Sequence, residues 1–366
     1  MATSIHALNE LGQSIWYDNI RRGLLDSGEL ARLIEAGVSG VTSNPTIFEK
    51  AIGGSNDYDA AITELVRRGL DAQAIYDQLT LEDIGRGADL LRPVYDRTNG
   101  EDGYISIEVP PTLAADTPAT VAEARRIFGT LNRPNVMIKV PATPEGIPAI
   151  RTLIADGVNV NVTLIFSLKT YDDVITAYWE GLEDRLQRGL PVDRVASVAS
   201  FFVSRVDTLV DKLIDERGLD PALRGKAAVA NAKLAYELFQ RRSAEPRWAA
   251  LAAKGARVQR PLWASTSTKN PAYPPLLYVD TLIGPHTVNT LPPQTVEAVL
   301  QSVKVARTVD ADLDRAHADL EALEAAGISM DWVTDQLMQQ GVKAFEDSFA
   351  SLMAGLEKKV AAVAAG

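Results

Sequence analysis

The chain of 366 residues contains no cysteine, and its only histidines are His6, His286 and His317. The absence of cysteine excludes structural disulfides, zinc–thiolate centres and a thiol nucleophile. The histidines lie too far apart in the sequence to form a local metal-binding motif, so we expect no metal site. His286 follows a Gly-Pro turn, and we expect it to be structural.

Basic residues are also few: 37 lysines and arginines stand against 48 aspartates and glutamates, a formal charge of −11. This balance argues against binding to nucleic acid or to an anionic membrane, because both need a dense basic face. No stretch approaches the roughly 20 apolar residues of a membrane-spanning helix. The first twenty residues contain no lysine or arginine and no apolar run typical of a secretory signal. We therefore expect a cytoplasmic protein.

Short runs rich in β-branched residues alternate with longer helical patterns, which is typical of a parallel sheet covered by helices. The length is compatible with about two domains, or with one barrel of about 200 to 400 residues. Because no linker or repeat divides the chain, we predict a single α/β domain over residues 1–366, a (β/α)8 TIM barrel. The predicted strands are 14–18, 40–43, 104–109, 136–140, 158–164, 196–202, 261–265 and 287–289.

Helical patterns outside the barrel repeat predict two additions. Residues 55–95 are predicted to form an insertion of two or three helices, and residues 331–359 a long closing helix. Between the first two strands, we expect Ser27 to cap a short helix and Gly37 to end it in a left-handed turn. The packing face of the closing helix is predicted to contain Phe345, Phe349, Leu352 and Leu356.

Three consecutive strands carry polar side chains on one face. Alternate residues of a strand point to opposite faces. In each of these strands the residues on one face are aliphatic, and those on the other face, the second set, are mostly polar. Strands of a parallel sheet are normally apolar on both faces, and an unsatisfied buried polar group costs about 1 to 3 kcal/mol. The second set therefore predicts a satisfied polar network or a site reached by solvent. Its members are Ser106, Glu108, Met137, Lys139, Asn159, Asn161 and Thr163.

Polar residues also gather where the predicted strands end. Barrels place their active sites at the carboxyl ends of the strands. The alternative is an open sheet with these groups simply solvated, but independent surface residues have no reason to collect at one end. The residues in this position are Asp18, Asn44, Glu108, Lys139, Thr163, Ser200 and Ser265.

Lys139, between Ile138 and Val140, is the most informative of these residues. Desolvation favours the neutral amine, which is the form that attacks a ketone to give a Schiff base. The resulting iminium accepts electrons, so a neighbouring carbon–carbon bond can break if a base such as Asp18 or Glu108 removes a hydroxyl proton. The alternative is a structural ion pair between Lys139 and Glu108.

Five segments together resemble transaldolase, most closely the longer bacterial branch of that family. The resemblance runs in order from Ile15 to about Pro292. The segments are GVTSNPTIF at 40–48, VMIKVPA at 136–142, NVNVTLIF at 159–166, ASFFVSR at 199–205 and WASTSTKNP at 263–271.

This resemblance implies a class I aldolase-type barrel that transfers a dihydroxyacetone unit between sugar phosphates without a metal or organic cofactor. It implies that Lys139 is the Schiff-base lysine and that Asp18 is the acid/base at the C4 hydroxyl. Glu108 and Thr163 would hold the water that shuttles protons. The implied partners are sugar phosphates, with the chain acting as a monomer or homodimer.

The resemblance also implies a set of substrate-binding residues. Arg205 is expected to bind the substrate phosphate. The family commonly has Ala-Ser-Phe-Arg-Asn after the seventh strand, but this chain departs from that pattern, so we assign the second phosphate cation to Lys269. Lysine can bind phosphate as a point charge, although it lacks the fork of arginine. The remaining members of the implied set are Asn44, Asn161, Ser200, Phe202 and Ser265.

Two other functions use the same pattern. A fructose-6-phosphate aldolase would use the same lysine and release dihydroxyacetone. A non-catalytic barrel would bind sugar phosphates, and Lys139 would then only pair with Glu108. The combination of Asp18, Glu108, Lys139 and Thr163 with the long chain favours the transferase.

Overall fold

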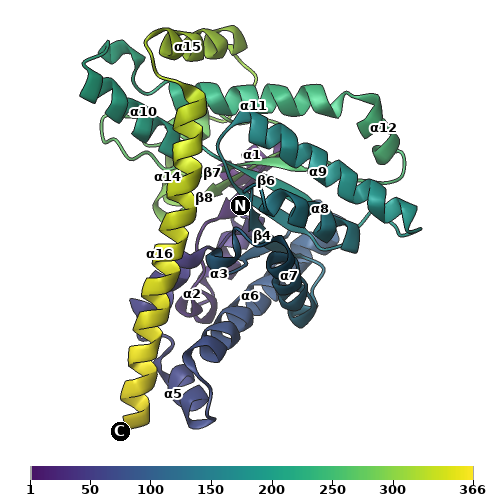
Figure 1. Cartoon of the computed structure of the whole chain (residues 1–366), viewed down its shortest axis with the longest axis vertical. Coiled ribbons are helices and arrows are strands. Elements are labelled where there is room, and N and C mark those ends of the chain that lie inside the picture. Colours follow the sequence, from purple (N-terminus) through teal and green to yellow (C-terminus); the bar gives the residue numbers. More distant parts are fainter. Residues whose placement is uncertain (1, 366) are drawn as a thin grey trace.

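Eight parallel strands close into a barrel in the computed structural model, which describes residues 2–365 (Figure 1). Each strand pairs with its neighbours in sequence order, and β8 pairs with β1 to complete the ring. The strands are β1 Gln13–Tyr17, β2 Gly40–Val41, β3 Ile105–Glu108, β4 Val136–Pro141, β5 Val160–Ile165, β6 Ser197–Phe202, β7 Arg260–Ala264 and β8 Thr287–Leu291.

The predicted (β/α)8 barrel is confirmed, and all eight predicted strands are present with shifts of a few residues at their ends. The alternative of a sheet open to water is wrong, because the ring closes and every residue of β3, β4 and β5 is buried. In the register, Glu108 lies opposite Lys139, and Lys139 lies opposite Asn161. The polar faces inferred from alternation therefore lie side by side.

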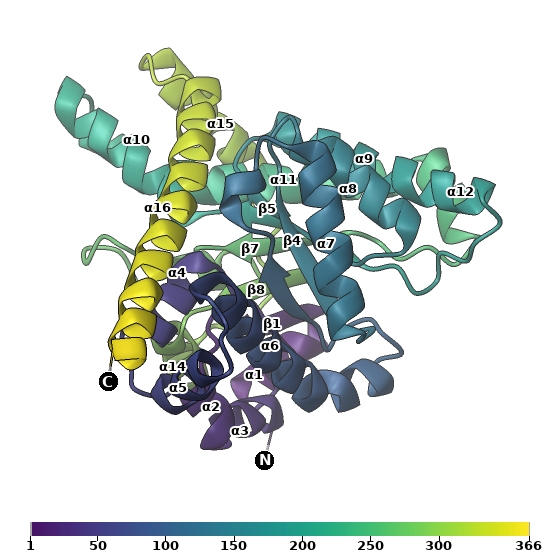
Figure 2. The ribbon, with the colours of Figure 1, turned by 60° about the horizontal axis from the view of Figure 1, so that its bottom comes forward.

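Helices surround the barrel and also cross its carboxyl end (Figure 2). The α-helices are α1 Ser4–Glu10, α2 Arg22–Asp26, α3 Glu29–Glu35, α4 Pro45–Phe48, α5 Asp59–Arg67, α6 Ala72–Arg97, α7 Thr117–Leu131, α8 Gly146–Asp156, α9 Leu168–Gln187, α10 Ser204–Arg217, α11 Ala227–Ser243, α12 Pro246–Ala252, α13 Leu277–Asp280, α14 Pro293–Ser302, α15 Leu313–Ala325 and α16 Met330–Ala365. Shorter turns are the π-helical η1 Glu49–Gly53 and the 3-10 helices η2 Pro111–Leu113 and η3 Pro221–Leu223. Within residues 2–365, none of these helices is both long and apolar enough to cross a membrane.

The turn between α2 and α3 corrects one expectation. Ser27 does not occupy the N-cap position of α3; that position belongs to Gly28, which has a left-handed φ of 72°. Ser27 ends α2 with helical backbone angles, whereas an N-cap residue normally has an extended backbone. Its hydroxyl still accepts the Glu29 N–H at 3.3 Å. Gly37 follows α3 with a φ of 109°, as predicted.

The amino end of the barrel is closed by a polar network around Asp102. Its carboxylate accepts hydrogen bonds from the Ser14 hydroxyl and, at 2.8 Å, from the Trp16 indole N–H. The Arg260 guanidinium donates to the Ser14 hydroxyl at 2.7 Å. Because these buried groups satisfy one another, the network costs little desolvation energy while it fills this end of the barrel.

Helix α16 lies along the opposite end and joins segments that are far apart in the sequence (Figures 1 and 2). It packs against α4, η1 and α5. The hydroxyls of Thr46 and Ser348 are 2.8 Å apart, and the Lys359 ammonium donates to the Asp59 carboxylate at 2.8 Å. The four apolar residues predicted to form its packing face are all buried. α16 therefore fixes the segment that follows β2.

Replacement of Leu352 by alanine should destabilise the fold, because this side chain on α16 is only 2% exposed. Leucine-to-alanine substitutions in cores typically cost about 2 to 5 kcal/mol. We expect a loss of this size in urea unfolding followed by tryptophan fluorescence. Glu346→Ala, at an exposed position of α16, is the control. Equal stability of the two variants would contradict the packing described for α16.

Candidate active site

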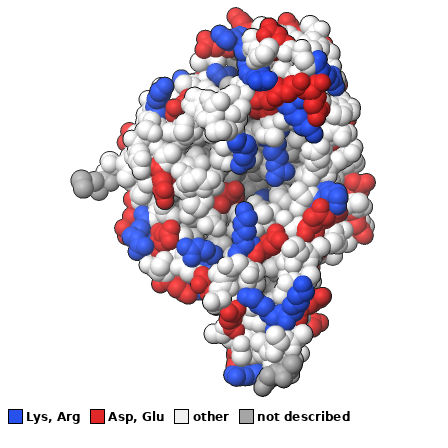
Figure 3. All heavy atoms as spheres, turned by 90° about the vertical axis from the view of Figure 1, so that its left-hand side faces the viewer, with Lys and Arg blue, Asp and Glu red and all other residues white. Residues whose placement is uncertain are grey.

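A pocket of about 670 Å³ opens at the carboxyl end of the barrel. The face seen in Figure 3 is hollowed at its centre, and basic side chains border the hollow. Phe345 of α16 forms part of the wall. Of the eleven predicted site residues, those that line the pocket are Asp18, Asn44, Lys139, Thr163, Ser200, Phe202, Arg205, Ser265 and Lys269.

Lys139 reaches the pocket from β4 although it is only 5% exposed. Its ammonium donates a hydrogen bond to the backbone carbonyl of Ser43 at 3.0 Å and lies 3.5 Å from the Glu108 carboxylate. The ion pair expected for a structural lysine is thus present, but the same side chain also lines the pocket. This arrangement orients the amine and keeps a proton acceptor beside it.

Glu108 and Thr163 flank Lys139 as buried groups with spare hydrogen-bonding capacity. Burial raises the pKa of Glu108, whereas the neighbouring Lys139 lowers it. In the part of the chain that the structure describes, Oγ1 of Thr163 has no hydrogen-bond partner, and Oε2 of Glu108 has only the long ion-pair contact of 3.5 Å to the Lys139 ammonium. Buried groups of this kind are normally satisfied by water or by a ligand, so both atoms are candidates for such contacts.

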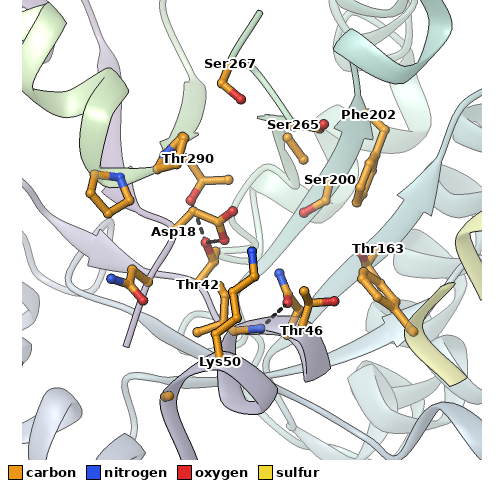
Figure 4. A pocket seen from close by; sticks show the side chains of 18 of the residues that line it. Asp18, Thr42, Thr46, Lys50, Thr163, Ser200, Phe202, Ser265, Ser267 and Thr290 are labelled. Atoms are coloured by element: carbon orange, nitrogen blue, oxygen red, sulfur yellow. Dashed lines mark hydrogen bonds between the residues drawn. The ribbon is translucent and has the colours of Figure 1, made fainter. Parts of the chain in front are cut away.

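Asp18 follows β1, and its carboxylate accepts a hydrogen bond from Thr42, whose hydroxyl in turn contacts that of Thr290. Thr42 donates to the Asp18 carboxylate at 2.7 Å, and the Thr290 hydroxyl lies 2.5 Å from that of Thr42 (Figure 4). Burial raises the pKa of Asp18, while Lys139 and the Thr42 hydrogen bond lower it. A carboxyl group balanced in this way is suited to exchange a proton with a bound hydroxyl.

Two asparagines have different positions in the site. Asn44 caps α4, and its side-chain oxygen accepts the Ile47 N–H at 2.9 Å, which leaves its amide group at the pocket. Asn161 is fully buried behind the lining residues, where its amide donates to Ser106 at 3.0 Å. Its oxygen accepts the Ser200 hydroxyl at 2.6 Å. Two predicted site residues, Glu108 and Asn161, thus do not line the pocket themselves. Glu108 contacts the lining residue Lys139, and Asn161 contacts the lining residue Ser200.

Two basic side chains, Arg205 and Lys269, also line the pocket. The Arg205 guanidinium stands 5.1 Å from the centre of the Phe202 ring, and burial lowers its pKa while Asp18 and Glu108 raise it. The Lys269 ammonium donates to the Ser267 hydroxyl at 2.7 Å. Burial lowers the pKa of Lys269, and the nearby positive charge of Arg205 lowers it further. An anion placed here would relieve this repulsion.

The backbone near the pocket contains two left-handed residues other than glycine. Leu164 has a φ of 59° and lies where the register between β5 and β6 shifts, directly after Thr163. Ser265, directly after β7, has a φ of 55°. Irregularities of this kind re-aim side chains and are common beside functional sites. Sequence periodicity gives no sign of either one.

Other pocket residues were missed as well: Thr42, Thr290, Lys50 and Phe345. Thr42 lies inside the segment GVTSNPTIF and directly follows β2. Its place at the carboxyl end of a strand could have identified it as a site residue. Phe345 was predicted only as a packing residue, because helical spacing does not reveal a cavity. No three acidic or histidine side chains come together as metal ligands within residues 2–365.

Comparison with known proteins places these features in a family. The family model described as transaldolase/fructose-6-phosphate aldolase matches residues 15–356, well beyond the segments noted in the sequence. The chain is 49% identical over 367 residues to transaldolase 2 of Nostoc sp., with 96% of each chain covered. It is also 49% identical over 363 residues to the transaldolase of Acidothermus cellulolyticus, with 98% of each covered. A transaldolase of Trichodesmium erythraeum is 47% identical, with 96% coverage of each.

Thr42→Val should raise the pKa of Asp18, since it removes the hydroxyl that stabilises the ionised carboxylate. A hydrogen bond to a charged group contributes about 1.5 to 3 kcal/mol, which corresponds to roughly 1 to 2 pH units. Carbon-13 NMR titration of aspartate-labelled protein measures the change, with Asp18→Asn to assign the signal. Thr42→Ser keeps the donor and should titrate like the native protein. An unchanged or lowered pKa in Thr42→Val would show that the bond does not act on Asp18.

Proposed function

This chain belongs to the transaldolase/fructose-6-phosphate aldolase family, and from that premise we propose that it is a transaldolase. The reaction is the transfer of a dihydroxyacetone unit from sedoheptulose 7-phosphate or fructose 6-phosphate to glyceraldehyde 3-phosphate or erythrose 4-phosphate. Such a reaction belongs to the pentose phosphate pathway and needs no cofactor. We further propose that the whole chain acts as one domain in the cytoplasm.

One observation carries the proposal: a buried lysine amine, paired with the Glu108 carboxylate, reaches a pocket that is also lined by the Asp18 carboxyl group and by cations. Lys139 attacks the C2 carbonyl of the ketose phosphate and forms a carbinolamine. Loss of water then gives an iminium. Glu108 and Thr163 are suited to the proton transfers of this step, because each has a buried oxygen available for water.

Cleavage follows from the electron demand of the iminium. Asp18 accepts the proton of the C4 hydroxyl, the C3–C4 bond breaks, and its electron pair moves to the nitrogen to give a three-carbon enamine. The aldose phosphate leaves. An acceptor aldehyde takes its place, the enamine carbon attacks it, and Asp18 returns the proton to the new alkoxide. Hydrolysis of the iminium releases the product and restores Lys139.

The remaining pocket residues have roles consistent with their contacts. Asn44 and Ser200 present polar groups to the donor hydroxyls, and Asn161 orients Ser200 through their 2.6 Å hydrogen bond. Phe202 shapes the wall and stacks on Arg205, which binds the phosphate together with Lys269. Ser265 contributes a hydroxyl beside them, 2.8 Å from that of Ser204.

The description of the family also includes fructose-6-phosphate aldolase, which releases its three-carbon product. The two functions differ in the fate of the enamine. A transferase protects it until an acceptor arrives, whereas an aldolase protonates it and releases dihydroxyacetone. With fructose 6-phosphate and erythrose 4-phosphate together, we expect sedoheptulose 7-phosphate to form faster than free dihydroxyacetone. The reverse order would favour the aldolase.

Borohydride reduction in the presence of fructose 6-phosphate should trap a three-carbon adduct on Lys139. Intact mass and peptide mapping identify the adduct and its position. Lys139→Met should give none, whereas Lys343→Met, at an exposed lysine of α16, should react like the native protein. If the folded protein binds the sugar phosphate but is never modified at Lys139, the covalent mechanism is wrong and the non-catalytic sugar-phosphate-binding barrel is favoured.

Asp18→Asn should separate Schiff-base formation from cleavage. The amide cannot accept the C4 hydroxyl proton, and loss of a general base typically lowers turnover by about 10² to 10⁴-fold. Trapping should then yield mainly the intact six-carbon adduct on Lys139. Glu346→Gln, which changes an exposed carboxylate of α16, is the matched control. Accumulation of the three-carbon adduct at the native rate would assign the base to another residue.

A further inference from the structure

Three cationic side chains line the pocket from three separate segments. Lys50 comes from η1, Arg205 from the first turn of α10, and Lys269 from the segment after β7. Within the described residues, none of the three forms an ion pair, whereas Arg21, also at the pocket, lies 3.7 Å from both Glu29 and Asp57. The three cations are therefore available to a ligand.

The charges of Arg205 and Lys50 both act on Lys269. Burial is the main cause that lowers the pKa of Lys269, and the charges of Arg205 and Lys50 lower it further, with only Asp18 opposing them. Unpaired like charges in one cavity repel each other, and this chain has an excess of acidic residues from which partners could have been drawn. A bound anion of high charge is the natural counterpart of such a group.

Lys50 occupies a special backbone position. It lies in the π-helical turn Glu49–Gly53, and π turns are rare and frequently found at functional sites. Helix α16 holds this turn in place. The Lys359 ammonium of α16 donates to the carbonyl of Ile52 in the turn at 3.2 Å and to that of Ser55, shortly after it, at 3.4 Å. In Figure 4 the Lys50 side chain extends from the ribbon into the pocket.

We propose that Lys50 is a third phosphate-binding cation, which acts with Arg205 and Lys269 to select sugar phosphates over free sugars. This proposal rests on the proposed function, because it assigns the phosphate of the same substrates to this group of three. A phosphate monoester carries close to two negative charges at neutral pH and three acceptor oxygens, so it can be bound by three donors at once. Lysine serves here as a point charge.

The test compares Lys50→Met with the native protein by borohydride trapping of fructose 6-phosphate and of fructose over a range of concentrations. We expect half-maximal trapping of the sugar phosphate to need about 10- to 100-fold more ligand in the variant, the size expected for one charge-assisted hydrogen bond. Trapping of fructose, which has no phosphate, should change less than about twofold, because the variant retains every group that contacts the sugar.

Two further variants separate charge from structure. Lys50→Arg keeps the positive charge and should restore most of the selectivity. Lys343→Met removes an exposed lysine that pairs with Asp347 at 2.9 Å on α16, and it should behave like the native protein. Higher salt should weaken the native preference more than that of Lys50→Met, because one phosphate contact has been lost.

Failure of this proposal can be distinguished from failure of the proposed function. If the native protein forms the adduct and Lys50→Met retains its preference for the phosphorylated sugar, Lys50 does not bind phosphate, although the transaldolase chemistry stands. If the native protein forms no adduct with either sugar, titration with inorganic phosphate by calorimetry still tests Lys50. Weaker phosphate binding by Lys50→Met would support the cation, and equal binding would overturn it.

Discussion

A lysine ammonium inside a closed barrel must have its charge met by neighbouring groups, and much of this structure follows from that constraint. Lys139 of β4 is satisfied by the Ser43 carbonyl, in the segment after β2, and by the Glu108 carboxylate of the adjacent strand β3. Glu108 is in reach because the parallel register of β3 and β4 keeps it opposite Lys139. The polar face that looks improbable in a parallel sheet therefore provides the groups that a buried lysine needs at this position.

The pocket brings together charges of both signs. Carboxyl groups with a pKa raised by burial, Asp18 and Glu108, lie near the lysine amine. Cations, among them Arg205 and Lys269, line the same pocket. A sugar phosphate, the class of substrate proposed above, likewise has hydroxyls that exchange protons at one end and a dianion at the other. Although the chain as a whole is acidic, several basic side chains line this pocket.

The sequence predicted those features that depend on local repetition. Alternation located the strands, and the position of Asp18, Lys139 and Thr163 at strand ends predicted that they would meet. It could not predict the hydroxyl contact between Thr42 and Thr290, which lie 248 residues apart. Nor could it predict the π turn, the bulge at β5 or which residues lie one layer behind the pocket. These features depend on packing between distant segments, and no periodic pattern records such packing.

The contact between Thr46 and Ser348 spans 302 residues, and this separation has a consequence for biosynthesis. A ribosome completes all eight strands before it reaches α16, so Phe345 and the support behind η1 are synthesised after the whole barrel sequence. Because a domain generally folds as a unit, the pocket can be complete only after α16 has been added. The wall of the pocket and the support of the π turn are therefore the last parts of the site that the growing chain acquires.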